Sequence, residues 1–231
     1  MADETRVADE TRVAPETRVA DETRVADETR VADETRVAPE TGRSAAPALA
    51  ALAQQAASCT ACALAAGRTQ VVFGVGDPDA DLVFVGEGPG REEDLRGEPF
   101  VGRSGQLLDR LMAEELGIDR SRCYIANVVK CRPPDNRDPL PGEIEACRPY
   151  LEAQLDLVHP VVVVTLGNFA TRLLLGTDRG VTSLRGAAYP FRDGSLVPTF
   201  HPAAALRGGG SVVAQMRADL VRAKALLGWS A

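Results

Sequence analysis

Four short apolar runs, each followed by a loop of unusual composition, constrain the fold of this chain more than any other feature. The runs cover residues 82–85, 124–129, 161–164 and 196–200. Runs that are apolar throughout are typical of strands buried on both faces. Helical periodicities follow them at 105–116, 141–157, 168–175 and 212–227. Strands alternating with helices predict an α/β fold with a parallel sheet covered on both faces.

The loops after these runs indicate where a ligand would bind. They read GEGPG at 86–90, NVVKC at 127–131, TLGN at 165–168 and HPAAALR at 201–207. In parallel α/β sheets the crevice at the carboxyl ends of the strands binds ligands. The four loops therefore predict one shared site.

Residues 1–42 are a separate segment built from a repeated hexapeptide, VADETR. A six-residue period places successive valines about 120° apart around a helix, so no apolar stripe forms. We expect a disordered tail, with a hexapeptide β-helix as the alternative. Residues 43–58 are Ala-rich and predict a linker that becomes helical, and residues 59–231 are the predicted folded domain.

The net charge of −7 mainly describes the repeat. Residues 1–42 contain twelve acidic residues and six arginines, so residues 43–231 carry a net charge of only −1. A basic face on the folded domain is therefore compatible with the composition. No stretch approaches the roughly 18 apolar residues of a membrane span, and the acidic start lacks the order of a signal peptide. We expect a cytoplasmic protein without a membrane partner.

Five cysteines without an export signal favour reduced thiols, a metal site or a redox centre over disulfides. Cys59 and Cys62 have the C-x2-C spacing in which two thiolates bind one metal, and Cys131 and Cys147 supply two further thiols. Four sulfur ligands suit zinc or an iron-sulfur cluster, and the spacing does not choose between them. Unrelated buried thiols are the alternative. Cys123 lies within an apolar run and is interpreted as a core residue.

The segments 86–109, 127–139, 165–170 and 201–207, with the cysteine pair, resemble in sequence and order the motifs of the iron-sulfur-containing uracil-DNA glycosylases, called family four. The resemblance covers about residues 55–231 and leaves out the repeat. It implies a three-layer α/β/α sandwich around a four-stranded parallel sheet. It also implies a structural 4Fe-4S cluster on Cys59, Cys62, Cys131 and Cys147, with zinc as the less favoured metal.

The activity implied by this resemblance is DNA repair. Such a hydrolase flips uracil out of DNA, because the target bond is inaccessible in the base stack. It then hydrolyses the N-glycosidic bond, releases free uracil and leaves an abasic site.

The resemblance also assigns residues to the uracil pocket. Gly86, Glu87 and Gly88 match the loop that lies against the base and sugar, where glycine permits close approach. Asn127 matches the residue whose amide bonds a uracil N–H and the neighbouring carbonyl, a pattern that cytosine reverses. Phe100 matches the aromatic beneath the flipped base. Taken alone, these residues also fit a strand-to-helix turn, a turn-forming Asn and a core Phe.

Four further positions complete the expected site. Glu93 matches a position near uracil C5, although its charged run also fits a solvated surface. His201 matches the donor to uracil O2, which stabilises the leaving anion, and His159 is interpreted as structural. Leu206 matches the residue that fills the vacated base stack, and Arg207 matches a phosphate contact.

The water-activating group is left open by the sequence. Some glycosylase families have Asp where this chain has Gly88. Either Glu87 is the base, or stabilisation of the leaving group and of the sugar cation means that water needs little activation.

Two alternatives to turnover are covalent capture of DNA and binding without release. A related group links covalently to uracil-DNA through a histidine in an inserted basic loop, but residues 131–137 (CRPPDNR) contain neither the insertion nor a histidine. The second alternative is a uracil- or abasic-DNA binding protein without turnover. We expect a nucleoid-associated monomer that acts on single- or double-stranded DNA, with Arg132, Arg137 and Arg207 around the pocket.

Overall fold

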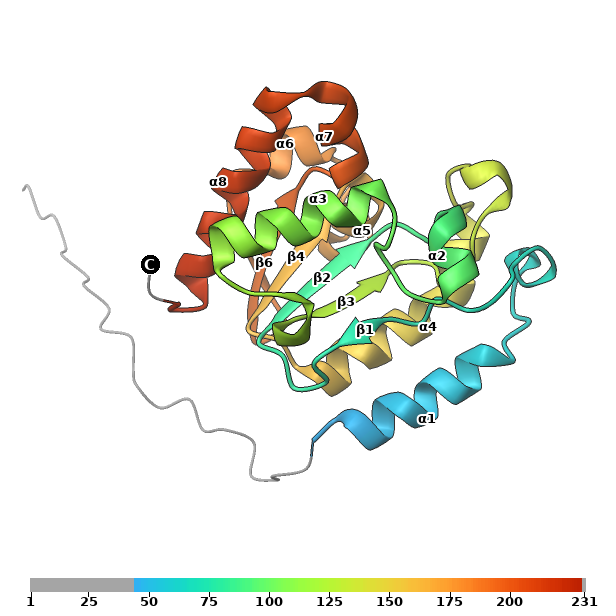
Figure 1. Ribbon diagram of the computed structural model, residues 1–231. Helices are drawn as coiled ribbons and strands as arrows, with labels where there is room; N and C mark the ends of the chain where they lie inside the picture. The colour runs from blue at the N-terminus through green and yellow to red at the C-terminus, as the bar shows by residue number, and fades with distance from the viewer. Residues whose placement is uncertain (1–43, 230–231) are drawn as a thin grey trace, which may run out of the picture. The chain divides into compact units, whose positions relative to one another are not determined.

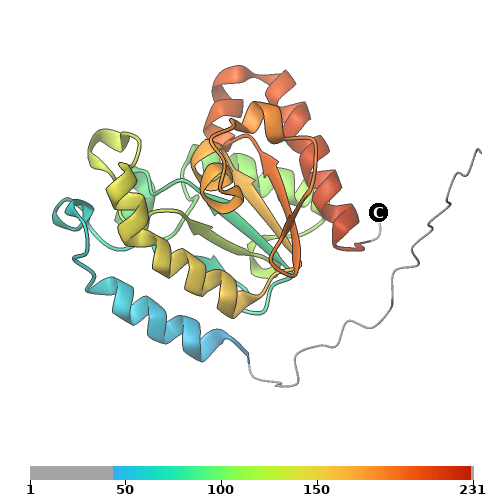
Figure 2. The same cartoon turned by 180° about the vertical axis from the view of Figure 1, so that it is seen from behind.

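A computed structural model describes residues 44–229, in which helices pack on both faces of one sheet (Figures 1 and 2). This arrangement confirms the predicted α/β class. The hexapeptide repeat lies outside the described residues, so the expected disordered tail remains a prediction. None of the helices in residues 44–229 is both long enough and apolar enough to cross a membrane.

The sheet contains six strands in the order β1-β3-β2-β4-β6-β5. Its four central strands are parallel: β2 (Leu82–Gly86), β3 (Tyr124–Asn127), β4 (Val162–Leu166) and β6 (Gly194–Thr199). These are the four predicted strands. Antiparallel strands β1 (Val75–Gly76) and β5 (Tyr189–Phe191) extend the two edges. The predicted count of four was too low, because strands of two or three residues are too short to show a periodicity.

Alternate side chains of the central strands point into two separate cores. Leu82 and Phe84 pack with residues of α3 (Arg103–Leu111) and α8 (Gly210–Leu226). Val83 and Val85 pack with residues of α1 (Ala46–Ala57), α4 (Pro141–Val158) and α5 (Asn168–Leu175). This period-two alternation is why the strands appear apolar throughout in the sequence.

Shorter helices connect these layers. They are α2 (Arg91–Arg96), α6 (Val181–Leu184), α7 (Pro202–Gly208), single 3-10 turns at Ala63–Ala66, Arg120–Arg122 and Pro134–Asn136, and a π turn at Met112–Leu116. The helix predicted at 105–116 therefore changes from α to π geometry at Met112. It ends at Gly117, which adopts the left-handed conformation (φ 72°).

Helix α1 lies along α4 in both views (Figures 1 and 2). Leu49 and Ala56 on α1 are buried. The Ala-rich segment therefore packs onto the α/β body as a helix and does not lead up to it as a free linker.

Strand register brings the predicted loops to one edge of the sheet. Gly86, the last residue of β2, pairs with Asn127, the last residue of β3. Leu166 at the end of β4 pairs with Thr199 at the end of β6. All four loops thus begin at the carboxyl edge, where the sequence places the site.

Candidate active site and cluster site

Asn127, Gly86 and Phe100 converge at the carboxyl ends of β2 and β3. The side chain of Asn127 is buried, and its Oδ1 is the one buried side-chain oxygen or nitrogen in residues 44–229 that has no hydrogen-bond partner. A Cβ added to Gly86 would lie 2.4 Å from this Oδ1 and 2.5 Å from Cζ of Phe100. Glycine at position 86 therefore keeps the space between the amide and the ring open.

Phe100 is held in a strained backbone conformation by polar contacts on both sides. Its φ is +55°, in the left-handed region that a residue with a side chain rarely adopts. Arg120 donates to the carbonyl oxygens of Pro99 (2.9 Å) and Phe100. Glu93 Oε1 accepts from the backbone N–H groups of Val101 (3.1 Å) and Gly102 (3.0 Å). Such conformations persist where surrounding contacts fix them, and they cluster at functional sites.

Glu93 makes backbone contacts that the sequence does not indicate, while its expected place near uracil C5 stays a prediction. Besides the two bonds above, its Oε2 accepts from the N–H of Gly90 at 3.1 Å. Both carboxylate oxygens are therefore engaged by the backbone of the loops that begin α2 and α3. Through these hydrogen bonds, Glu93 fixes the backbone next to Phe100.

His201 faces Phe100 from the end of β6, with ring centroids 5.5 Å apart and planes 33° apart. Its Nδ1 accepts from the backbone N–H of Ala203 at 3.2 Å, so in the neutral ring the proton lies on Nε2. Burial, with the nearby Arg207 charge, lowers the pKa of His201 to about 4. A neutral imidazole whose proton is fixed on Nε2 can donate a hydrogen bond to an atom on which negative charge develops.

Glu87 and Gly88 differ in their surroundings. Burial, followed by the negative charge of Asp138, raises the pKa of Glu87 to about 7. A Cβ on Gly88 would lie 2.6 Å from Cγ2 of Val129, which is fully buried. Position 88 therefore excludes a side chain, whereas Glu87 offers a carboxyl group that titrates near neutral pH.

Lys130, which was not among the predicted site residues, connects Asn127 to the cysteines. It is buried, and its Nζ donates to the backbone carbonyl of Asn127 at 2.8 Å and to Oε1 of Gln154. Its backbone N–H donates to Sγ of Cys147 at 3.3 Å. A signal existed in the sequence: of the chain's two lysines, Lys130 is the one within the motif loops.

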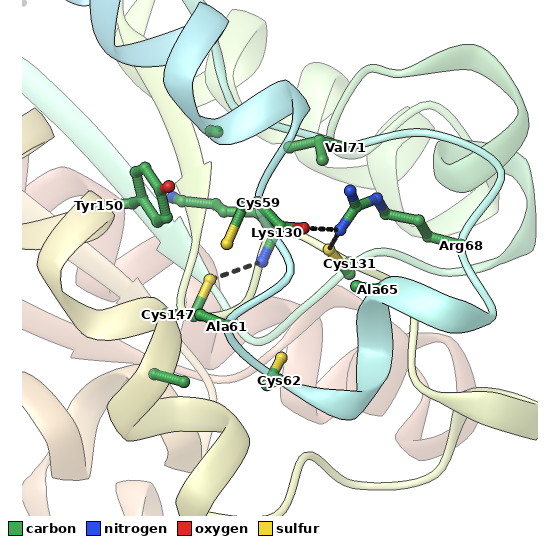
Figure 3. Close-up of a pocket in the computed structure, with 12 residues that line it drawn as sticks. Cys59, Ala61, Cys62, Ala65, Arg68, Val71, Lys130, Cys131, Cys147 and Tyr150 are labelled. Carbon is green, nitrogen blue, oxygen red and sulfur yellow. Dashed lines mark hydrogen bonds between the residues drawn. The ribbon is translucent and has the colours of Figure 1, made fainter.

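The four predicted cysteine ligands line one cavity of about 320 Å³, a volume that includes the open mouth (Figure 3). Cys59 and Cys62 come from the loop after α1, Cys131 follows β3, and Cys147 lies on α4. Alanine residues contribute much of the remaining wall. Within residues 44–229, no three Cys, His, Asp or Glu side chains are placed so as to hold a single metal ion. Cys123 lies elsewhere, fully buried in the other core, as predicted.

Arg68 is a further residue of this cavity that the sequence analysis did not identify. Its guanidinium donates to Sγ of Cys131 at 3.4 Å and to the carbonyl oxygen of Cys59 at 2.7 Å, and Figure 3 shows it between the two loops. No spacing rule indicates such a contact, because it joins residues 63 positions apart.

Of the residues expected to contact DNA, some are exposed without a protein partner and others are bonded to neighbouring side chains. Leu206 on α7 is 46% exposed, and the neighbouring Arg207 is exposed too. Arg137, by contrast, forms a two-pronged ion pair with Glu143 (2.6 and 2.8 Å), and Arg132 donates to Asn136. Arg137 is therefore ion-paired with Glu143, and its expected place around the pocket stays a prediction.

Comparison with known proteins agrees with this geometry. The Uracil DNA glycosylase superfamily model matches residues 73–223. The type-4 uracil-DNA glycosylase of Thermotoga maritima is 44% identical, over 76% of this chain and 93% of the relative, and that of Sulfurisphaera tokodaii is 45% identical, over 66% and 73%. A type-5 enzyme of Thermus thermophilus is 37% identical over 55% of this chain and 62% of the relative. This chain belongs to the uracil DNA glycosylase superfamily, within the type-4 family of uracil-DNA glycosylases.

Proposed function

We propose that this protein excises uracil from DNA by hydrolysing the N-glycosidic bond, as a DNA-repair glycosylase. The observation that carries the proposal is the buried Oδ1 of Asn127, which has no partner among the described residues. A buried acceptor without a partner costs roughly 1–3 kcal/mol, so its position points to a ligand that supplies a donor. The N3–H of uracil is such a donor.

The pocket supports selection of uracil over cytosine. With Oδ1 of Asn127 accepting from N3–H, its Nδ2 donates to the neighbouring O4 carbonyl. Cytosine presents an acceptor at N3 and an amino group at C4, so both contacts become repulsive. Phe100 supplies the stacking surface, held in place by Glu93. Glu93 thus supports the base indirectly, because it fixes the loop that carries Phe100.

The chemistry rests on stabilising the departing uracil anion. His201 is neutral at pH 7 because burial lowers its pKa to about 4. Its Nε2–H donates to O2 as negative charge develops there. A preorganised donor of this type contributes roughly 3–4 kcal/mol to the transition state.

The Asn127→Asp variant tests whether the amide of Asn127 bonds the uracil base. The variant keeps acceptor oxygens but loses the amide donor, and its negative charge opposes O4. We expect kcat/KM for uracil-DNA to fall about 10- to 100-fold, the cost of a lost bond to a buried polar group. The matched control is Asn168→Asp, because Oδ1 of Asn168 only accepts, from Val181 N–H at 2.8 Å. Equal losses in both variants would contradict the assignment.

Glu87→Gln tests water activation. General-base catalysis is typically worth 10²- to 10⁴-fold, and leaving-group stabilisation reduces the share that water activation must supply. We expect the single-turnover rate to fall by less than about 10³-fold. Because burial raises the pKa of Glu87 to about 7, its ionised fraction increases from pH 6 to pH 8. The unaltered protein should accelerate over that range and the variant should not. A larger loss would make Glu87 an obligatory base.

The four cysteines are proposed to hold a 4Fe-4S cluster. A cavity lined by four cysteines and four alanines suits such a cofactor. N–H groups of Arg68 and Lys130 already donate to two of the sulfurs, which is the outer-shell pattern that stabilises ligating thiolates. When bound, the cluster supplies a covalent cross-link between three segments of the chain. Zinc remains the alternative.

The decisive assay measures free uracil released from oligonucleotides that contain one uracil, with thymine and cytosine oligonucleotides for comparison. Release from uracil-DNA alone, with an abasic site left behind, is the expected result. Tight binding without release would support the non-catalytic alternative. An adduct that survives SDS would instead indicate covalent capture. Parallel single- and double-stranded substrates determine the strand preference.

A further inference from the structure

The face formed by α3 and α7 carries arginines without protein partners. Arg103 and Arg110 on α3 are exposed, and neither forms a hydrogen bond or ion pair with any described residue. Elsewhere in the described part of the chain, guanidinium groups are commonly engaged by carboxylates, as Arg137 is by Glu143 and Arg185 is by Asp219. Arg103 and Arg110, like Arg91, Arg122 and Arg207, have no such partner among the described residues.

The acidic residues of the same segment do not neutralise them. Asp109 pairs with Arg120 at 2.6 Å. Glu114 and Glu115, in the π turn that follows α3, both pair with Arg217 of α8. With its carboxylates engaged by other arginines, α3 keeps the positive charge of Arg103 and Arg110 on its outer face.

A shallow groove runs along this face. Its lining includes Arg103, Gln106 and Arg110 of α3 and Leu206 of α7, and its volume is about 510 Å³ with the open side included. The α3 residues recur every three to four positions, so they share one side of the helix, and Arg103 and Arg110 stand about 10 Å apart along its axis. The groove thus adjoins Leu206, the residue proposed to fill the vacated base stack.

The position of Arg103 is unfavourable for the free protein. It is the first residue of α3, where the helix dipole is positive and a cation is disfavoured by roughly 0.3–1 kcal/mol. Glu93, whose carboxylate accepts from the N–H groups of Val101 and Gly102, already supplies negative charge at this helix end. An anion in the groove would add a direct partner for the Arg103 guanidinium.

We propose that the groove between α3 and α7 binds the phosphate backbone of DNA beside the extruded nucleotide, with Arg103 and Arg110 each contacting a phosphate. Arginine forks match phosphate oxygens in geometry and charge. Leu206 would then enter the base stack while α3 holds the flanking backbone. The inference rests on the proposed function and adds a second contact area to it.

The test is the salt dependence of DNA binding by the double variant Arg103→Gln/Arg110→Gln. The probe is a duplex with one stable abasic-site analogue, so binding is measured without catalysis. Each phosphate contact contributes about 0.9 to the slope of log K against log salt concentration. Losing two contacts should reduce the slope by about 1.8 on duplex DNA. Both side chains are exposed, so folding should be unaffected.

Arg122→Gln/Arg192→Gln is the matched control, because it also removes two positive charges, one from the segment before β3 and one from the turn between β5 and β6. That turn precedes β6 and lies at the end of the sheet opposite the site. Its slope should equal that of the unaltered protein. An unchanged slope in the double variant, or an equal reduction in the control, would overturn the proposal.

Uracil release at saturating DNA separates this inference from the proposed function. The double variant should release uracil at the unaltered single-turnover rate, because the groove lies outside the pocket. A slower rate at saturation would overturn the assignment to backbone binding. Failure of the proposed function would appear differently, as absence of release by the unaltered protein.

Discussion

His201→Ala is expected to slow uracil release by about 10²- to 10³-fold in single turnovers with enzyme in excess. The reason is geometric as well as chemical. The bond from Ala203 N–H to Nδ1 fixes the tautomer, so that Nε2 always presents a proton. Alanine removes this donor where the uracil anion forms, while Asn127 and Phe100 remain to bind the base. The loss should therefore appear in the maximal rate and much less in DNA affinity.

The second histidine provides the control for this experiment. His159 ends α4 in a left-handed conformation and is half exposed, with Asp193 at 3.9 Å. His159→Ala should leave the rate unchanged. Because the pKa of His201 is about 4, no rate change between pH 6 and pH 8 should depend on His201. A rate for His201→Ala within tenfold of the unaltered protein would contradict the leaving-group role.

Cys147→Ala is expected to abolish both the cofactor and the activity. Broad absorbance near ~400 nm, which a filled-shell zinc ion lacks, should disappear. Loss of a metal site is among the mechanisms that cost about 4–5 kcal/mol, and in a domain of this size each kcal/mol lowers Tm by roughly 2–4 °C. The melting temperature should thus fall by about 10 °C or more.

Activity should be lost with the cluster because the two sites share Lys130. Its backbone N–H bonds Cys147 Sγ, and its ammonium group bonds the carbonyl of Asn127. Cys123→Ala is the matched control, since Cys123 is buried away from the cavity. That variant should keep the absorbance and the uracil activity, with a modest loss of stability from the small cavity. Colourless, fully active unaltered protein would contradict the cluster proposal.

The sequence alone predicts those parts of the fold that have a strong local pattern of apolar residues. The four central strands and the helices after them match their predicted segments closely, because burial on two faces leaves continuous apolar runs. The carboxyl-edge location of the loops follows from the parallel topology. The gathering of Cys59, Cys62, Cys131 and Cys147 follows from the resemblance, and the structure brings them to one cavity.

The remaining features depend on contacts between distant segments. Glu93 sits in a charged run that gives no sign of the Phe100 loop, eight residues away, that it holds. Arg68 and Lys130 likewise gain their partners only when α1, β3 and α4 pack together. The ion pair between Arg137 and Glu143 on α4 likewise gave no signal in the sequence. Such pairings have no periodicity to detect.

The contact between Gly88 and Val129 limits how this active site can evolve. A side chain at position 88 would collide with a fully buried valine. An aspartate there, as in some other glycosylases, would require Val129 to shift or to become smaller, which disturbs a fully buried part of the core. Packing thus couples the two positions, so the effects of substitutions at Gly88 and Val129 are not expected to add.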